Sequence, residues 1–205
     1  MECLVDYNFY KDYQNYIFDR KLKNRVKYFK TRYGIKKQCL DTIIKDHFVE
    51  IFCWSVIPLN ILNMLGEIIK RNEITGVIDP CCGNAFHTYL FGNVLGLNTY
   101  SVDIQDEPHS WKNIIEEDGR LFIKKLSPID HTNNLLLLSW IDYDSLTTEL
   151  LDLYQGNLVI SLGNYDKLSP NYVRKLNESF KLIKKVVLKM PWDLSENLEV
   201  YLRIK

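Results

Sequence analysis

The stretch from Val77 to His87 constrains the fold of this chain more than any other. A short apolar run, Val77-Ile78, ends in the acidic residue Asp79, and a tight turn of small residues then leads into an apolar segment at Phe86. A buried strand followed by a tight turn and a helix places the turn at the carboxyl end of the strand, where open α/β sheets bind their ligands. The sequence therefore predicts a ligand site at the turn that follows Asp79.

A second predicted strand also ends in a carboxylate. It runs from Asn98 to Asp103, and Asp103 follows Asp79 by 24 residues. Rossmann-like sites use an interval of roughly 20 residues, which brings the second carboxylate to the hydroxyls of a ribose. We therefore expect a Rossmann-like sheet that presents a nucleotide-type cofactor.

The rest of the chain shows a pattern of alternating strands and helices. The clearest strand is Asn134 to Trp140, because an unbroken run of four leucines is typical of a central parallel strand that is buried on both faces. Further strands are expected at residues 119–125, 157–162, 182–189 and 198–204, helices at 59–70, 86–95, 146–154 and 169–179, and a loop at 104–118. This order predicts a three-layer α/β fold with a mainly parallel sheet and an antiparallel last strand.

Residues 1–58 are predicted to form a helical extension that precedes the α/β domain of residues 59–205. Within this extension, the segment from Arg20 to Lys37 contains nine Lys or Arg residues and no Asp or Glu. Its apolar residues fall on one helical face, so the basic residues point outward. A solvated surface accounts for such a face, and a contact for RNA or a protein partner is the alternative.

Composition narrows the class of protein further. The formal net charge is zero, so no global field attracts the chain to nucleic acid. The five cysteines include no Cys-x-x-Cys pair, and the four histidines show no zinc-ligand spacing, which favours a reducing compartment and no metal site. No apolar run approaches the ~20 residues that cross a bilayer, and the first residues lack the organisation of a signal peptide. We therefore expect a cytoplasmic protein without a membrane span.

Several short motifs occur in an order typical of one enzyme class. They are Ile57-Pro58, the turn from Asp79 to His87, Val102-Asp103, the stretch from Leu136 to Tyr143, Tyr154-Gln155-Gly156 and Met190-Pro191-Trp192. In this order they resemble the class I methyltransferases that use S-adenosylmethionine, and more narrowly a methyltransferase-like family of bacteria and fungi. The resemblance covers residues 54–205 and leaves the N-terminal helices unexplained.

This resemblance implies which residues hold the cofactor S-adenosylmethionine. The first turn would approach its methionine part, Asp103 would hold its ribose, and the tip of the four-leucine strand would face the methyl group and the acceptor. The implied cofactor-binding residues are Asp79, Pro80, Cys81, Gly83, Asn84, Asp103, Ile104 and Trp140. The implied catalytic candidates are Asp142, Tyr143 and His109, with Asp142 or His109 as the base.

The chain departs from the family pattern at two places. Cys81 and Ala85 replace glycines of the first turn, and Ile141-Asp142 replaces a pair of prolines. A β-carbon at the first position restricts the backbone and narrows the approach of a ligand. Two functions therefore stay open: a methyltransferase of unknown acceptor, with RNA as one candidate, and a catalytically inactive methyltransferase-like subunit that binds RNA or a partner protein. A nicotinamide-dependent oxidoreductase would also use Asp103, but the chain lacks its glycine fingerprint.

Overall fold

A computed structural model describes residue 49 and residues 52–55, 57–105, 110–141, 144–163, 169–189 and 195–204. The segment from Arg20 to Lys37 lies outside the described residues, as do His109, Asp142 and Tyr143. The first described helix of the α/β unit, α4, begins at Leu59. The division of the chain after residue 58 stays a prediction.

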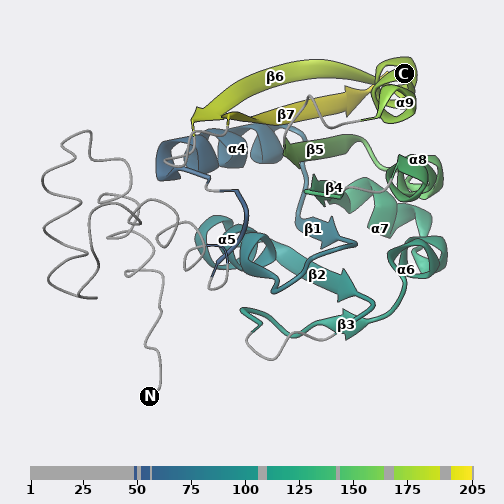
Figure 1. The fold of residues 1–205 in the computed structure, drawn as a ribbon, viewed down its shortest axis with the longest axis horizontal. Helices are drawn as coiled ribbons and strands as arrows, with labels where there is room; N and C mark the ends of the chain where they lie inside the picture. Colours follow the sequence, from purple (N-terminus) through teal and green to yellow (C-terminus); the bar gives the residue numbers. More distant parts are fainter. Residues whose placement is uncertain are drawn as a thin grey trace, which may run out of the picture.

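In the described residues, one sheet of seven strands forms the middle of the fold (Figure 1), in the order β3-β2-β1-β4-β5-β7-β6. The strands are β1 (Gly76–Asp79), β2 (Asn98–Asp103), β3 (Ile115–Glu116), β4 (Asn134–Ser139), β5 (Leu158–Gly163), β6 (Phe180–Lys189) and β7 (Ser195–Arg203). The first five strands are parallel to one another, whereas β7 runs antiparallel to both β5 and β6. The predicted fold class is therefore confirmed.

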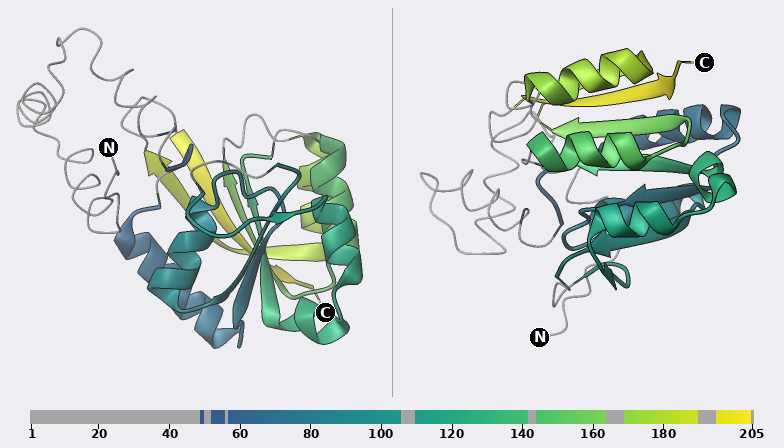
Figure 2. Two further views of the ribbon diagram at one scale, coloured as in Figure 1. Left: turned by 90° about the horizontal axis from the view of Figure 1, so that it is seen from below. Right: turned by 90° about the vertical axis from the view of Figure 1, so that its right-hand side faces the viewer.

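Helices cover both faces of this sheet, so the fold has three layers (Figure 2). They are α4 (Leu59–Arg71), α5 (Phe86–Leu95), α6 (Gly119–Lys125), α7 (Pro128–Asn133), α8 (Asp144–Leu153) and α9 (Pro170–Ser179). The start of α9 was predicted from Ser169-Pro170, and the Ser169 side chain does accept a hydrogen bond from the backbone N–H of Tyr172. None of the described helices is long and apolar enough to cross a membrane.

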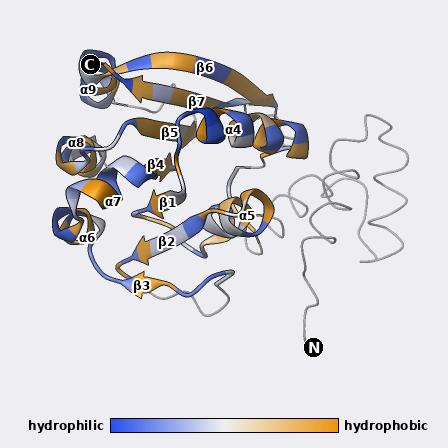
Figure 3. Cartoon of the chain, turned by 180° about the vertical axis from the view of Figure 1, so that it is seen from behind, coloured by the Kyte–Doolittle hydropathy of each residue, from blue (hydrophilic) through white to orange (hydrophobic). Residues whose placement is uncertain are grey.

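The side chains of β4 divide between two hydrophobic cores. Leu135 and Leu137 pack under α4 and α5, whereas Leu136 and Leu138 pack under the helices of the opposite face. Alternate residues of a strand point to opposite faces, so a strand covered on both sides must be apolar throughout. This explains the run of four leucines and the apolar colouring of the central strands (Figure 3).

One predicted strand is wrong. Residues 119–125 form helix α6, and the third strand is the two-residue β3, inside the stretch predicted as a loop. Asp118 caps this helix by accepting a hydrogen bond from the backbone N–H of Arg120 at 2.8 Å. Gly119 and Ile123, four residues apart, are its buried residues, as expected for a helix packed on one side.

Helix α7 was not predicted, although the sequence carries a signal for it. Ser127 and Asp130 form a capping box, and Pro128 occupies the first turn. These residues start α7, which ends at Asn133, immediately before β4.

Gly119 allows α6 to pack directly against the turn that follows β1. A β-carbon built on Gly119 would lie 2.4 Å from the carbonyl oxygen of Pro80, which is backbone and cannot move aside cheaply. We predict that Gly119→Ala lowers the free energy of unfolding by about 1–3 kcal/mol, as expected for overpacking. Chemical denaturation measures this change.

Gly66→Ala is the matched control. Gly66 lies inside α4, and its added β-carbon would meet only the end of the Leu95 side chain, at 3.1 Å. Since alanine is a better helix former than glycine by about 0.5–1 kcal/mol, this variant should be neutral or more stable. Equal losses in both variants would contradict the proposed contact between α6 and the turn.

Candidate functional site

A cavity of about 500 Å³ opens at the carboxyl ends of β1, β2 and β4. The chain passes from β1 outward to β2 and β3, and then returns to place β4 on the other side of β1. Open α/β sheets bind ligands at such a reversal of strand order. The cavity is lined by Val49, Phe52, Cys53, Trp54, Asp79, Cys81, Cys82, Gly83, Asn84, His87, Asp103, Ser139 and Trp140.

The Asp79 carboxyl ends β1 and is only 1% exposed. The Thr88 hydroxyl donates a hydrogen bond to its Oδ2 at 3.0 Å, whereas its Oδ1 has no hydrogen-bond partner among the described groups. Burial, assisted by the nearby Asp103 carboxylate, raises the pKa of Asp79 to about 7. Asp79 is therefore a buried acid at the cavity wall, and one of its oxygens lacks a hydrogen-bond partner among the described residues.

The turn after β1 is clamped to the end of β2. The backbone N–H of Gly83 donates to Oδ2 of Asp103 at 2.9 Å, and that of Cys82 donates to the carbonyl oxygen of Val102 at 3.1 Å. Gly83 and Ala85 both have positive φ angles, of 51° and 59°. The clamp thus fixes the two predicted carboxylates, Asp79 and Asp103, on the same cavity.

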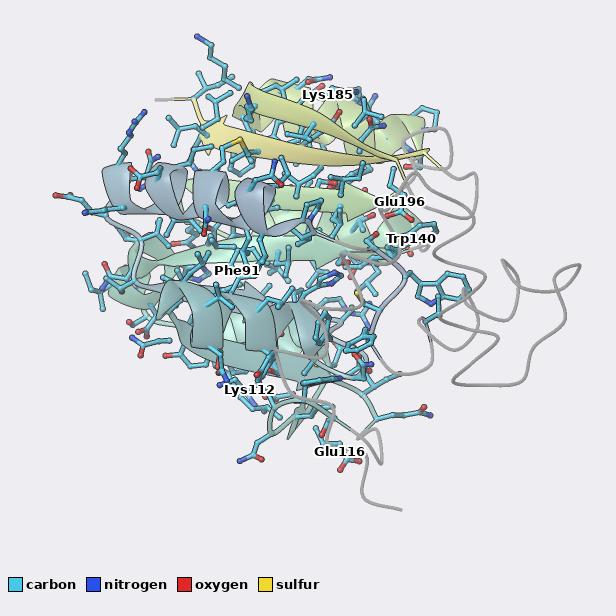
Figure 4. The ribbon with its side chains drawn as sticks, turned by 90° about the vertical axis from the view of Figure 1, so that its left-hand side faces the viewer. Phe91, Lys112, Glu116, Trp140, Lys185 and Glu196 are labelled. Carbon is cyan, nitrogen blue, oxygen red and sulfur yellow. The ribbon has the colours of Figure 1, made fainter. Side chains whose placement is uncertain are left out.

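Ser55 connects three segments beside the cavity through its hydroxyl and its carbonyl oxygen. Its hydroxyl accepts a hydrogen bond from the Trp140 indole and donates one to Oε2 of Glu196. Its carbonyl oxygen accepts from Nε2 of His87 at 3.0 Å. Figure 4 shows Trp140 and Glu196 together at one end of the sheet. The segment before α4 is therefore bonded to α5, β4 and β7 at once.

His87 is a neutral part of this network. Because a carbonyl oxygen can only accept, Nε2 of His87 carries the hydrogen, and Nδ1 accepts from the Ser139 hydroxyl at 3.2 Å. Burial lowers the pKa of His87 to about 4. Glu196 shows the opposite shift, since burial raises its pKa to about 7, and its Oε1 lacks a partner within the described structure.

Three cysteines also line the cavity, but as thiols rather than thiolates. Burial raises the pKa of Cys81 to about 12 and that of Cys53 and Cys82 well above the ordinary range. Thiols of this kind are poor nucleophiles and poor metal ligands. In the described ranges, no group of three or more His, Cys, Asp or Glu side chains is placed to hold a metal ion.

The structure brings together six of the predicted cofactor residues, namely Asp79, Cys81, Gly83, Asn84, Asp103 and Trp140. Two others lie outside the lining: Pro80 is buried, and Ile104 is 68% exposed just beyond β2. The three catalytic candidates fall outside the described residues.

Sequence reasoning missed much of the polar network. His87 and Ser139 were visible as polar residues beside the turn and at the end of a buried strand. Ser55 and Glu196 gave no comparable signal, because they are 141 residues apart and meet only through the fold.

Comparison with known proteins supports the fold. No protein-family model and no curated protein sequence matches the chain. The structure is similar to magnesium protoporphyrin IX methyltransferase from Synechocystis PCC 6803 with bound SAM, at 12% identity and a TM-score of 0.50, over 80% of this chain and 97% of that chain.

Two further solved structures are a SAM-dependent methyltransferase from Archaeoglobus fulgidus and an rRNA methylase from Streptococcus thermophilus, each 13% identical to this chain. Their TM-scores are 0.49 and 0.46, and they cover 77% and 74% of this chain and 99% and 100% of their own. The strand order and the likeness to the Synechocystis enzyme show that this chain has a class I methyltransferase-like fold.

The buried acid and the buried histidine predict opposite effects of pH on stability. Between about pH 4 and pH 7 the folded protein keeps a proton on Asp79 that the unfolded chain has lost, so raising the pH destabilises the fold. Asp79→Asn removes this penalty, and its stability relative to the natural protein should improve from about pH 5 to about pH 8, by at most about 4 kcal/mol. Denaturation at a series of pH values measures the difference.

His87→Gln serves as the control of opposite sign. The unfolded chain gains a proton on His87 between about pH 6.5 and pH 4, and the folded protein does not, so lowering the pH destabilises the fold. The variant should therefore improve relative to the natural protein as the pH falls. If the difference in stability between Asp79→Asn and the natural protein did not change with pH, the raised pKa of Asp79 would be ruled out.

We predict that the Ser55 hydroxyl contributes measurably to the free energy of unfolding. Ser55→Ala removes one hydrogen bond each from Oε2 of Glu196 and Nε1 of Trp140. A hydrogen bond to a charged group contributes about 1.5–3 kcal/mol and a neutral one about 0.5–1.5 kcal/mol, so the free energy of unfolding should fall by about 1–3 kcal/mol. The exposed Ser145, at the start of α8, provides the control, and Ser145→Ala should change stability by less than about 0.5 kcal/mol. A silent Ser55→Ala variant would contradict the network.

Proposed function

We propose that this chain is a methyltransferase that uses S-adenosylmethionine. The observation that carries the proposal is the Asp79 carboxyl, which lies buried at the cavity wall with one oxygen that has no hydrogen-bond partner among the described residues. A buried acid in this state is costly unless a ligand supplies a donor. An ammonium group fits best, because a positive charge also favours the ionised carboxylate. The amino group of S-adenosylmethionine is such a donor.

The second carboxylate supports the same ligand. Oδ2 of Asp103 accepts the Gly83 N–H, whereas among the described groups its Oδ1 accepts only a longer contact, 3.4 Å from the backbone nitrogen of Gln105. Oδ1 therefore keeps the capacity to accept a hydrogen bond from a ribose hydroxyl. The volume of about 500 Å³ also falls in the usual range for small-molecule sites, roughly 300–1,000 Å³.

The residues of this chain would act mainly by binding and orienting. When bound, S-adenosylmethionine supplies a methyl group carried on a positively charged sulfur. Asp79 would hold its amino end and Asp103 its ribose, on opposite sides of the first turn. Ser139 and Trp140 would form the wall on the β4 side. Correct placement of two reactants provides much of the rate in such a transfer.

A binding subunit without transfer activity is the second candidate, and the first turn favours it. The backbone N–H groups of Cys82, Gly83 and Ala85 all donate hydrogen bonds within the chain. Fewer donors then remain to hold the carboxylate of the cofactor. In this case RNA or a partner protein would bind through the basic segment Arg20 to Lys37, and RNA is likewise one candidate acceptor for an active enzyme.

Calorimetric titration with S-adenosylmethionine and S-adenosylhomocysteine distinguishes the two candidates. We expect binding, and we expect Asp79→Asn and Asp103→Ala each to weaken it by about tenfold or more, because each variant removes a hydrogen bond to a charged group. Glu178→Gln, on the exposed surface of α9, is the control and should bind normally. Absence of binding to the natural protein would leave the binding subunit as the function.

The same titration provides a second test of the role of Asp79. Burial raises the pKa of Asp79 to about 7, so below that pH an incoming ammonium group should displace its proton. The measured heat should then depend on the ionisation enthalpy of the buffer. This dependence should disappear in Asp79→Asn and persist in Glu178→Gln.

A further inference from the structure

Strand β6 forms one edge of the sheet, and no other described strand pairs with its outer side (Figure 1). It is ten residues long, whereas β3, the strand at the opposite edge, has only two residues. The backbone N–H and C=O groups along the outer side of an edge strand are open to another extended chain. A long edge of this kind is therefore a place where a strand from a partner can be added.

One face of β6 exposes positive charge. Lys181 lies opposite Leu202 of β7, and Lys184 lies opposite Val200. Both β7 residues pack in the hydrophobic core under α4. Because directly opposite residues of paired strands point to the same face, the two lysines lie on the α4 side of the sheet. Both are exposed, and neither forms an ion pair with a described residue.

The other face of β6 exposes apolar side chains. Leu182 lies opposite Tyr201, which packs in the core on the α9 side, and Val187 lies opposite Asn197. Asn197 and Tyr201 are four residues apart on one strand and so point to the same face. Leu182 is 41% exposed and Val187 is 54% exposed. A strand added outside β6 would therefore meet lysines on one face and apolar side chains on the other.

The inner side of β6 already contains one pair of opposite charges. Nζ of Lys185 lies 2.6 Å from Oε1 of Glu199, the residue opposite it on β7, and Figure 4 shows Lys185 at the edge of the sheet. Cross-strand pairs of opposite charge stabilise a sheet. Lys184 has no such acid on β7, because Val200 lies opposite it. A carboxylate on an added outer strand would provide the missing partner.

A β-bulge sets the length of the open edge. The register between β6 and β7 shifts between Leu182 and Lys184, and the pairing is regular from Lys184 to Lys189. A bulge bends its strand and disrupts a regular ladder. The regular part would accept an added strand of about six residues, which is about 20 Å long.

The composition of β6 argues against two other occupants. The strand contains four lysines and no Asp or Glu, so pairing two copies of β6 would bring like charges together, which destabilises a sheet. Surfaces that bind single-stranded RNA combine positive charge with aromatic rings that stack on the bases. The aromatic residue of β6 is Phe180, which is only 2% exposed. Charge and open backbone together therefore favour an acidic, extended peptide.

We propose that β6 binds, by strand addition, an extended segment of a partner protein in which acidic and apolar residues alternate. Its acidic side chains lie on the α4 side near Lys184, and its apolar side chains lie on the α9 side near Val187. Backbone hydrogen bonds supply the affinity, and the two faces supply the specificity. No β6 residue is among the described lining residues of the cavity, so this inference is independent of the proposed methyl transfer.

The experiment titrates the full chain with an eight-residue capped peptide in which Glu and Val alternate. A peptide of the same composition, with its Glu and Val residues in two separate blocks, is the control ligand. We expect the alternating peptide to bind, the block peptide to bind more weakly, and added salt to weaken both. Lys184→Glu should weaken binding of the alternating peptide by about fivefold or more, because attraction becomes like-charge repulsion.

Two controls separate the edge of the sheet from net charge and from loss of folding. Lys124→Glu makes the same change of charge on the exposed surface of α6 and should bind the peptide normally. Lys184→Glu should gain binding of a peptide in which Lys and Val alternate, which also shows that this variant is folded. Equal weakening by Lys184→Glu and Lys124→Glu would overturn the inference.

Hydrogen exchange of the natural protein locates the bound peptide. Backbone N–H groups of β6 between Lys184 and Lys189 should exchange more slowly when the alternating peptide is bound, because they then donate to the added strand. Absence of peptide binding, or protection confined to other elements, would overturn the inference. Tighter binding of oligouridylate than of the peptide would assign the lysines to RNA instead. Peptide binding without binding of S-adenosylmethionine would overturn the proposed function and support the inference.

Discussion

The burial of the Asp79 carboxyl at the end of β1 is the constraint on which the rest of the site depends. Strand β1 lies between β2 and β4 and has no polar side chain before this residue, so Asp79 places a polar group at a buried position. The Thr88 hydroxyl from α5 donates a hydrogen bond to one oxygen, and the other oxygen is buried without a hydrogen-bond partner among the described residues. An apolar residue here would stabilise the fold more simply, because a buried acid is costly without a partner. The buried acid therefore indicates a ligand. Asp103 and the first turn lie at the same cavity, so we interpret them as parts of the same ligand site.

The other half of the site, which includes Trp140, depends in the same way on the polar network around Ser55. Ser55 precedes α4 in the sequence, yet its hydrogen bonds reach α5, β4 and β7. The wall that includes Trp140 is thus fixed by residues that are close only after the whole sheet has formed. Buried networks of this kind impose one arrangement on their members, since any other leaves a polar group unpaired. The Trp140 side of the cavity is accordingly held in one arrangement by the Ser55 network. The acidic side is held by separate contacts.

The sequence predicted the fold well because its strongest signals are local. A run of four leucines, an acid at the end of each of two strands and the Ser-Pro start of α9 each reflect a physical demand met within a few residues. The mistaken strand at residues 119–125 also comes from a local signal, because a short apolar stretch suits a strand or a helix equally. The Asp118 cap favours the helix. The acidic half of the site was predictable for similar reasons. The Ser55–Glu196 contact was not, because a pairing across 141 residues leaves no trace in a single sequence.

The replaced glycines of the first turn do not by themselves argue against a working site. Cys81 is partly buried and packs against one of the two hydrophobic cores, and Ala85 is fully buried at the start of α5. Ala85 does adopt the left-handed conformation that glycine would adopt freely, at a cost of roughly 1–2 kcal/mol. The replacements thus introduce backbone strain and leave a cavity of about 500 Å³ beside the turn. The Cys82 and Gly83 N–H groups serve the clamp to β2, and the Ala85 N–H donates to the carbonyl oxygen of Cys82, so these three donors are already used. A ligand bound here must therefore be held by the carboxylates and the aromatic wall. Binding then depends on these side chains rather than on the glycines of the turn.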